Sequence, residues 1–332
     1  AMSGIHMISM TKNTQSTETL KQMAQKAFPR EACTEILELT EGYFNVAYLL
    51  RFDSGRESVL KIAPPKDARI MSYEKNIMYS EITAMRLAAQ KTDVPVAEIL
   101  FFDDSITLCS SPYFFMEKLE GESLSSLADS LPESDIKEIR KDTGILNRKI
   151  NSITGEQFGY MGLPQMQNKN WYTVFCCMMD MALTDAEAMS VDLKIPVPKL
   201  KGYLEKSKAL FEQVTIPCLV HWDLWDGNIF IKNGRITGLI DWERSMWADP
   251  LMEVGFRTYR QEPDFLLGYG IEALSFEEQL RALWYDIYVT MLAAQECAYR
   301  QYDTTQMYDW ATGMLTEKFS QLSRHYDPDS KL

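Results

Sequence analysis

The sequence predicts an α+β protein with two lobes: an N-terminal antiparallel sheet with a helix, and a larger, mainly helical C-terminal lobe. Strand-like segments separated by short turns dominate the first part of the chain, whereas amphipathic helical patterns dominate from Ser123 onward. With 332 residues, the chain is long enough for two lobes that each bury a core. We expect residues 1–10 to be a tag remnant and disordered start, 11–119 the N-terminal nucleotide-binding lobe and 120–332 the C-terminal lobe.

The N-terminal lobe is expected to begin with a helix and continue as a sheet. Residues 17–28 are amphipathic, with Leu20, Met23 and Ala24 on one face. A second helix is expected at about 73–90, between the third and fourth strands. The expected strands are residues 34–40, 44–52, 57–63, 96–102 and 113–117.

The C-terminal lobe is expected to be built from amphipathic helices. The proline-rich turn at 195–198 is typical of a connection between two helices. The expected helices are residues 133–153, 171–191, 199–214, 276–300 and 306–323.

The segment most informative about function is Val220–Asn228. It contains His221, Asp223 and Asn228 in the pattern H-x-D-x-x-x-x-N, and Asp241 follows. Phosphoryl transfer from Mg-ATP needs a carboxylate that orients and deprotonates the acceptor hydroxyl, and oxygen ligands that hold magnesium against the phosphates. These residues therefore predict phosphoryl transfer. The alternative is that Asn228 caps a turn and Asp241 ends a strand.

A β-hairpin explains the position of the second aspartate. Two short apolar strands are joined by Asn233-Gly234, the pair preferred in type I′ turns. Pairing the strands across this turn places Asn228 opposite Leu239. Asp241 is then a diagonal neighbour of Asn228, about 7–8 Å away at the backbone. We expect both side chains to converge on one magnesium site.

These residues resemble the catalytic segment of a known family. His221, Asp223 and Asn228, then Asp241, then Asp249-Pro250 have a spacing similar to that of the aminoglycoside phosphotransferase and choline kinase group. These are small-molecule kinases with a two-lobed protein-kinase-like fold, and the resemblance covers most of the chain. It implies that Asp223 is the catalytic base, that Asn228 and Asp241 bind Mg²⁺, and that ATP or GTP is the phosphoryl donor.

The resemblance also assigns roles to neighbouring residues. His221 is expected to orient the catalytic loop by hydrogen bonding, and Asp249 to cap a helix that begins at Pro250. In this family the residue after the histidine is often glycine, and the metal-binding aspartate is often followed by phenylalanine. Trp222 and Trp242 stand at these positions here.

Lys61 lies within an apolar strand, where a buried ammonium group is costly without a partner. The resemblance assigns it to the α- and β-phosphates of the nucleotide, paired with a glutamate of the following helix. Glu81 is preferred and Glu74 is the rival. The alternative is a surface lysine on an edge strand.

Four further positions are expected to contact the nucleotide. Gly42 and Asn45 lie where a phosphate-covering loop would be, although an ordinary hairpin turn has the same composition. Glu117 and Leu119 lie by position at the hinge, where adenine would bond to backbone groups.

Composition limits the acceptor and the partners. Lys plus Arg number 34 and Asp plus Glu 47, so the formal net charge is −13. This charge argues against nucleic-acid binding and fits a small cationic acceptor, although acidic chains are also simply soluble. No apolar run is long enough to span a membrane, so a cytoplasmic monomer or homodimer is expected. Glu243, Asp180 and Asp286 are the candidate acceptor ligands, and the alternative is that they solvate helix surfaces.

Three functions remain open at this stage. The first is a small-molecule O-phosphotransferase with an aminoglycoside-type antibiotic as leading acceptor. The second is a metabolic kinase for choline, a sugar derivative or an amino alcohol. The third is a nucleotide-binding pseudokinase, which the presence of Lys61, Asp223, Asn228 and Asp241 argues against. Protein kinase activity is disfavoured because the short stretch between Asp241 and Asp249 leaves no room for a long activation segment.

Overall fold

The computed structural model describes residues 12–39 and 46–330. Contacts divide them into two compact units. The first contains the chain up to Ile70 together with Ala97–Leu119 and Cys297–Thr304, and the second contains Met71–Val96, Glu120–Glu296 and the chain from Thr305. Residues 71–96, which the sequence led us to place in the N-terminal lobe, therefore belong to the second unit by their contacts.

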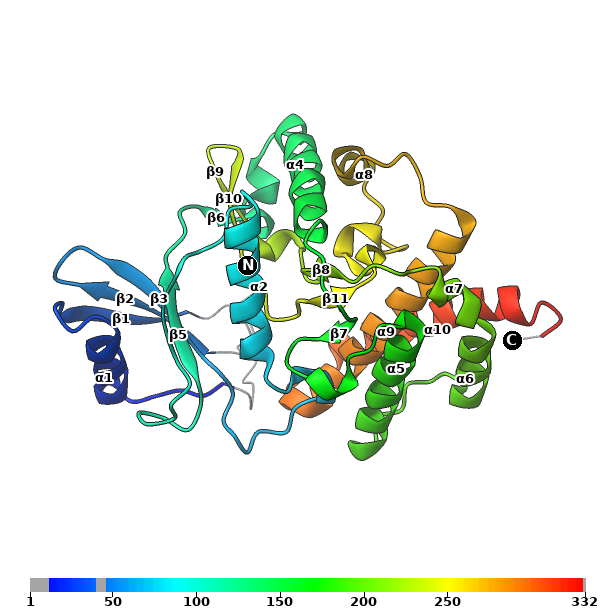
Figure 1. The fold of residues 1–332 in the computed structure, drawn as a ribbon, viewed down its shortest axis with the longest axis horizontal. Coiled ribbons are helices and arrows are strands. Elements are labelled where there is room, and N and C mark those ends of the chain that lie inside the picture. The colour runs from blue at the N-terminus through cyan, green and yellow to red at the C-terminus, as the bar shows by residue number, and fades with distance from the viewer. Residues whose placement is uncertain (1–11, 40–45, 331–332) are drawn as a thin grey trace. The chain divides into compact units, whose positions relative to one another are not determined.

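The first unit is an antiparallel sheet of five strands in the order β1-β2-β3-β5-β4, with helix α1 (Thr17–Ala27) packed against it (Figure 1). Ser16 caps α1 by accepting a hydrogen bond from Thr19 N. The buried face of α1 contributes Leu20 and Met23 to a core shared with the sheet. The strands are β1 (Cys33–Leu39), β2 (Val46–Phe52), β3 (Glu57–Ile62), β4 (Ile99–Asp103) and β5 (Tyr113–Glu117).

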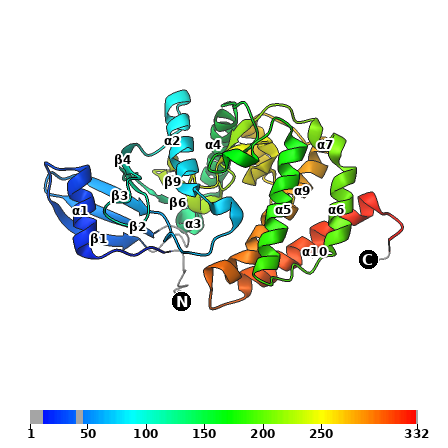
Figure 2. The ribbon, with the colours of Figure 1, turned by 60° about the horizontal axis from the view of Figure 1, so that its bottom comes forward.

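The second unit is mainly helical, and Figure 2 shows α5, α6, α9 and α10 gathered at one end of it. Helix α9 ends in residues that group with the first unit. Two small sheets, β10-β9-β6 and β7-β11-β8, complete the second unit. Its helices are α2 (Ile77–Lys91), α3 (Leu124–Leu127), α4 (Glu133–Asn151), α5 (Trp171–Ala188), α6 (Val197–Lys206), α7 (Lys208–Glu212), α8 (Pro263–Tyr269), α9 (Phe276–Arg300) and α10 (Gln306–Tyr326). Its strands are β6 (Glu122–Ser123), β7 (Gly159–Tyr160), β8 (Cys218–Val220), β9 (Ile229–Lys232), β10 (Arg235–Leu239) and β11 (Met246–Ala248).

Two expected helices differ from the observed ones. The helix expected at 73–90 begins only at Ile77, because Ser72–Glu74 forms a 3₁₀ turn and Asn76 has a left-handed backbone with φ 55°. The helix expected at 199–214 is divided into α6 and α7 at Ser207. The hydroxyl of Ser207 donates to Tyr203 O at 2.8 Å and contacts the hydroxyl of Tyr326, so a tertiary contact accompanies the break.

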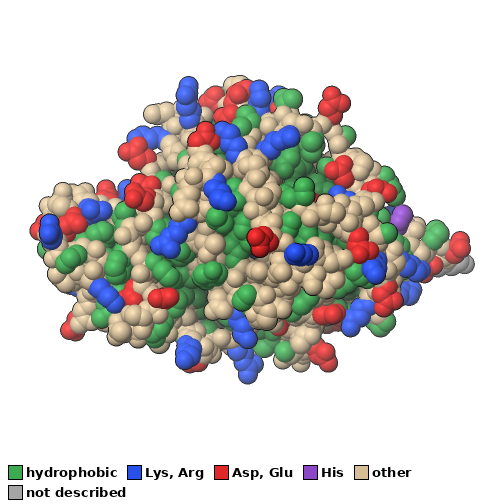
Figure 3. Space-filling model, viewed as in Figure 1, with side chains coloured by type: hydrophobic (Ala, Val, Ile, Leu, Met, Phe, Trp, Pro, Cys, Tyr) green, Lys and Arg blue, Asp and Glu red, His purple; other side chains and the backbone are tan. Residues whose placement is uncertain are grey.

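The surface and the helices bear on two expectations from composition. In the described part of the chain, no helix has both the length and the apolar character needed to cross a bilayer. On the face shown in Figure 3, acidic and basic side chains are interspersed. The net negative charge is therefore not segregated on that face.

Candidate functional site

The hairpin that carries the expected magnesium ligands is formed by β9 and β10. Asn233 and Gly234 have φ values of 53° and 73°, as a type I′ turn requires. The register differs from the expected one, because Leu239 pairs with Ile229 and not with Asn228. A bulge at Thr237 shifts the pairing by one residue, and the Thr237 hydroxyl donates to Glu120 O at 2.5 Å.

The shifted register changes how Asp241 is presented. Ile240 N donates to Asn228 O at 3.0 Å, so Asp241 follows the residue opposite Asn228 by one position instead of two. The expected diagonal arrangement is therefore wrong. Asp241 instead leaves the strand with a left-handed backbone, φ 56°, which aspartate tolerates better than most residues. This turn of the backbone replaces the strand alternation that we expected to orient its side chain.

Asp223 and Asn228 are in direct contact. Asn228 Nδ2 donates to the carbonyl oxygen of Asp223 at 2.8 Å and to its Oδ2 at 3.2 Å. The amide nitrogen is thereby directed to Asp223, and Asn228 Oδ1 is the atom that remains for a cation. His221 lies behind this pair: its Nε2 is 2.9 Å from Ile240 O, and its Nδ1 accepts from Asp223 N at 3.2 Å. These bonds fix the tautomer with the proton on Nε2 and agree with an orienting role for His221.

Glu253 binds the backbone of the same loop. The sequence did not lead us to expect a role for this residue. Its side chain is fully buried. Oε1 accepts from Trp222 N at 2.7 Å, and Oε2 accepts from His221 N at 3.1 Å. Two amides of α4, Asn147 Nδ2 and Asn151 Nδ2, also donate to Oε2, the second at 2.9 Å. A single charged residue within the apolar run from Pro250 to Phe256 was the available signal.

Trp222 has an unusual conformation for a bulky residue. Its φ is 67°, in the left-handed region that glycine prefers, and its ring is fully buried. The ring stacks on Tyr288 with centroids 5.7 Å apart and meets the edge of Tyr73 at 6.0 Å. Arg257 Nη2 donates to Trp222 O at 3.2 Å. Packing and hydrogen bonds thus stabilise a backbone conformation that is unfavourable for tryptophan alone.

Arg244 lies between Asp223 and this aromatic cluster. Its guanidinium lies 5.6 Å from the ring of Trp222 and 6.0 Å from that of Tyr73. It lies 3.9 Å from Asp223 Oδ1 and 3.1 Å from Glu296 Oε1. Arg244 was also missed by sequence analysis, because nothing in the local pattern indicates that it turns back toward Asp223.

The electrostatic environment of Asp223 is mixed. Its side chain is 23% exposed. Removal from water raises the pKa of the Asp223 carboxyl above its usual value, and the negative charges of Asp241 and Glu296 act in the same direction. Arg244 and Arg257 oppose this rise in pKa. A carboxylate with these neighbours is suited to accept a proton from a hydroxyl.

The glutamates of the region around α2 have separate hydrogen bonds within the second unit. Glu81 Oε2 accepts from Trp242 N at 3.2 Å, directly after Asp241. Glu74 Oε1 accepts from Met71 N at 3.0 Å and closes the turn before the helix. Glu81 is therefore the glutamate connected to the segment that follows Asp241. Its pairing with Lys61 stays a prediction, since Lys61 belongs to the first unit.

The remaining nucleotide residues lie in the first unit or outside the described residues. Lys61 is buried in β3, between Ala47 and Phe114 of the neighbouring strands. Glu117 ends β5, and its Oε1 accepts from Glu98 N at 2.8 Å. Leu119 is half-buried. Gly42 and Asn45 lie outside the described residues.

The three expected acceptor ligands have different environments. Glu243 is half-buried in the turn after Trp242. Asp180 is exposed on α5 and lines a pocket of about 570 Å³. Asp286 is fully buried, and its Oδ2 accepts from Thr258 N at 3.1 Å and from the Thr258 hydroxyl. Burial raises the pKa of Asp286 to about 6. In this structure Asp286 anchors the segment at Thr258.

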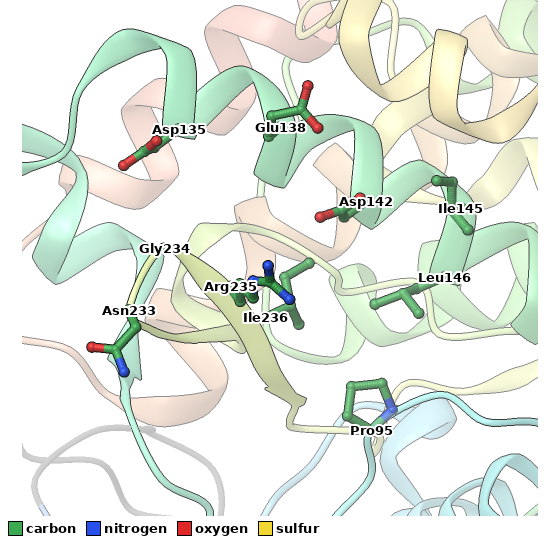
Figure 4. Close-up of a pocket in the computed structure, with 10 residues that line it drawn as sticks. All are labelled: Pro95, Asp135, Glu138, Asp142, Ile145, Leu146, Asn233, Gly234, Arg235 and Ile236. Atoms are coloured by element: carbon green, nitrogen blue, oxygen red, sulfur yellow. The ribbon is translucent and has the colours of Figure 1, made fainter.

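A pocket of about 590 Å³ lies between α4 and the β9–β10 hairpin (Figure 4). Its side chains include the acidic Asp135, Glu138 and Asp142 of α4 and the basic Arg235 of the hairpin. None of the expected site residues lines it. The pocket is thus separate from the residues that the sequence predicts as the site.

The side chains present fit a magnesium ion shared with phosphates. Within residues 12–39 and 46–330, no group of three or more His, Cys, Asp or Glu side chains could hold a metal by itself. Mg²⁺ is commonly bound by one or two protein oxygens and completed by phosphate oxygens and water. Asn228 Oδ1 and the carboxylate of Asp241 supply that number of oxygen ligands.

Comparisons with known proteins agree with this geometry. Residues 35–284 match the family model described as the phosphotransferase enzyme family. A subtelomeric hrmA-associated cluster protein of Aspergillus fumigatus is 32% identical over 131 residues, which are 39% of this chain and 25% of that protein. Hygromycin-B 4-O-kinase of Escherichia coli is 24% identical over 68% of this chain and 62% of its own length. The chain thus spans a quarter of the first relative and less than two thirds of the second.

Solved structures show the same fold. A ternary complex of a thermostable mutant of aminoglycoside phosphotransferase APH(4)-Ia with AMP-PNP and hygromycin B has a TM-score of 0.64 and 19% identity, covering 93% of this chain and 99% of that chain. The streptomycin-ATP complex of APH(2")-IIa has a TM-score of 0.56 and 16% identity, covering 94% and 97%.

Proposed function

The chain belongs to the phosphotransferase enzyme family, and on this basis we propose that it transfers the γ-phosphoryl group of ATP or GTP to a hydroxyl of a small molecule. The observation that carries the proposal is the contact of the Asn228 amide with the Asp223 carboxylate. The charge of Asp241 acts on this carboxylate, and the buried Glu253 binds the backbone of the same loop at Trp222. Asn228 precedes the β9–β10 hairpin and Asp241 follows it, and the bond from Ile240 N to Asn228 O joins the two ends, which supports a base and two oxygen ligands at one site. A pseudokinase would not need all three groups.

In the proposed mechanism Asp223 accepts the proton of the acceptor hydroxyl. Asn228 donates to Asp223 Oδ2, which leaves Oδ1 on the side of Arg244. Asn228 Oδ1 and Asp241 would hold Mg²⁺, which neutralises charge on the phosphates when bound. His221 keeps the backbone of Asp223 in place through Nδ1 and ties the loop to Ile240 through Nε2. Catalysis then depends on positioning and charge stabilisation.

We propose the nucleotide roles of the first unit on the family resemblance. Lys61 would contact the α- and β-phosphates and pair with Glu81, while Gly42 and Asn45 would cover the phosphates. Glu117 and Leu119 would border the adenine. The burial of Lys61 supports this role, because a buried ammonium group is stabilised by anionic partners.

The leading acceptor is an aminoglycoside-type antibiotic. The match to hygromycin-B 4-O-kinase supports this class, and the net charge of −13 suits a cationic acceptor. Glu243 and Asp180 are the candidate carboxylates for its amino groups. A resistance kinase in the cytoplasm, monomeric or dimeric, is the corresponding biological role.

The test is acceptor-dependent ADP release by the purified protein with Mg-ATP or Mg-GTP and hygromycin B, streptomycin or choline. Asp223→Ala should lower turnover by about 10²–10⁴ while nucleotide still raises the melting temperature. Asp241→Asn should keep the left-handed backbone and weaken Mg²⁺-dependent nucleotide binding. Asp104→Ala, an exposed carboxylate of the first unit, is the matched control. Equal turnover of Asp223→Ala and the parent would refute the mechanism, and choline as the preferred acceptor would favour a metabolic kinase.

A further inference from the structure

The catalytic loop carries one exposed aromatic side chain. Trp225 follows Asp223 by two residues and is 42% exposed, whereas Trp222 and Trp242 beside it are 0% and 1% exposed. Two residues of chain span at most about 7 Å, so the backbone of Trp225 lies within that distance of the backbone of Asp223. A large apolar ring at this position is available to whatever molecule brings its hydroxyl to Asp223.

The backbone of Trp225 is held in place. Its N–H donates to Asp223 O at 3.0 Å, and its own carbonyl accepts from Asn228 N at 2.9 Å. The next residue, Asp226, accepts from Arg140 Nη2 at 2.9 Å, and Arg140 also pairs with Glu262 at 3.3 Å. The loop that carries Trp225 is therefore fixed by the ion pairs of Arg140 and by hydrogen bonds to Asp223 and Asn228.

The ring of Trp225 packs against Gly227. A Cβ atom added to Gly227 would lie 2.3 Å from Cζ2 and 2.4 Å from Cη2 of Trp225. The indole thus lies against Gly227, and a side chain at this position would displace the ring. An exposed tryptophan that packs on one side against the backbone presents a broad aromatic surface, and its two side-chain torsions limit the conformational entropy lost on binding.

We propose that Trp225 is a specificity-determining residue that stacks on the acceptor. The inference rests on the proposed function and deepens it by naming the chemistry of the acceptor beside its reactive hydroxyl. The acceptor presents a flat face of C–H groups with a cationic substituent, as an aminated sugar or cyclitol ring does. Such a face packs against an aromatic ring, and its positive charge is attracted by the π electrons.

The first experiment measures steady-state kinetics with hygromycin B as probe. Trp225→Ala should raise the KM for hygromycin B about 5- to 30-fold, the range that aromatic and cation–π contacts support, with kcat within about 2-fold. Trp225→Phe should recover most of the affinity. The Kd of Mg-ATP should not change. Phe276→Ala is the matched control, because Phe276 is an exposed aromatic residue packed on His325 at the start of α9.

A second pair of variants tests the packing of the Trp225 ring against Gly227. Gly227→Ala should displace the ring and raise KM for hygromycin B, whereas the same substitution in a Trp225→Ala background should add little, because the colliding ring is gone. Additive effects of the two changes would contradict the geometry.

The outcomes separate this inference from the proposed function. An active parent whose Trp225→Ala variant keeps the KM of the parent overturns the stacking role alone. A parent that releases no ADP with hygromycin B, streptomycin or choline overturns the proposed acceptor class and the inference with it. An elevated KM restored by phenylalanine supports both.

Discussion

Glu253→Gln should destabilise the second unit and loosen the catalytic loop. Four donors converge on this buried carboxylate: the backbone N–H groups of His221 and Trp222 and the amides of Asn147 and Asn151. Glutamine preserves the shape but has one acceptor oxygen. If that oxygen takes the place of Oε2, three donors keep an acceptor, and the new NH₂ group faces Trp222 N–H.

The magnitude follows from that mismatch. Losing the charge-assisted bond at 2.7 Å costs about 1.5–3 kcal/mol, and leaving the Trp222 N–H unsatisfied costs about 1–3 kcal/mol more. Because both terms count the same Trp222 N–H bond, they overlap in part, and we expect a loss of about 3–5 kcal/mol. This corresponds to a melting temperature lower by roughly 6–20 °C for a unit of this size. Release of the left-handed Trp222 should also lower kcat by about 10-fold or more.

The assay is urea unfolding followed by circular dichroism, together with steady-state ADP release. Glu317→Gln, an exposed carboxylate in the middle of α10, is the matched control and should change stability by less than about 0.5 kcal/mol. A loss below about 1 kcal/mol for Glu253→Gln, with kcat unchanged, would refute the claim that this carboxylate holds the loop.

Two more predictions concern buried charges. The pKa of Asp286 is about 6 in the folded protein and near 4 when unfolded, so the parent loses stability as pH rises from about 4 through 6. The Asp286→Asn variant cannot ionise at this position. Its free energy of unfolding, minus that of the parent, should therefore rise over that window by at most about 3 kcal/mol and then level off. If urea unfolding gave a difference independent of pH, this prediction would be contradicted. Arg244→Gln removes the guanidinium from Asp223 and Glu296 and should lower kcat about 10- to 100-fold with little change in Mg-ATP binding. Arg244→Lys should restore part of the rate, and a kcat within about 2-fold of the parent for the glutamine variant would argue against a positioning role.

The sequence predicted the parts of the site that local spacing determines. The H-x-D-x-x-x-x-N segment, the Asn233-Gly234 turn and the cap at Asp249 all lie where their local patterns indicated, and Asp249 Oδ1 accepts from Leu251 N at 3.1 Å. The same holds for the five strands of the first sheet, although the strand expected at 96–102 begins only at Ile99.

The parts that were missed depend on contacts between distant residues. The bulge at Thr237 is fixed by Glu120 O, which is 117 residues away in the chain, so no local pattern could supply the register. The left-handed Asn76 delays the start of α2, and its side chain donates to Gly162 O at 3.0 Å. Glu253 acquires its role only because α4 and the loop at His221 meet at the same carboxylate.

The way in which Glu253 binds the loop bears on which residues position 222 can accept. At residues 221 and 222 it accepts hydrogen bonds from backbone N–H groups, and these bonds do not involve the side chains. Every amino acid except proline can supply such an N–H, so the side chain of residue 222 is not needed to hold the loop. The residue at 222 must fit the space left by Tyr73 and Tyr288, and its backbone must adopt a left-handed φ of 67°. A glycine in place of Trp222 would suit the left-handed backbone and keep the N–H that Glu253 binds, but it would leave a cavity beside Tyr73 and Tyr288.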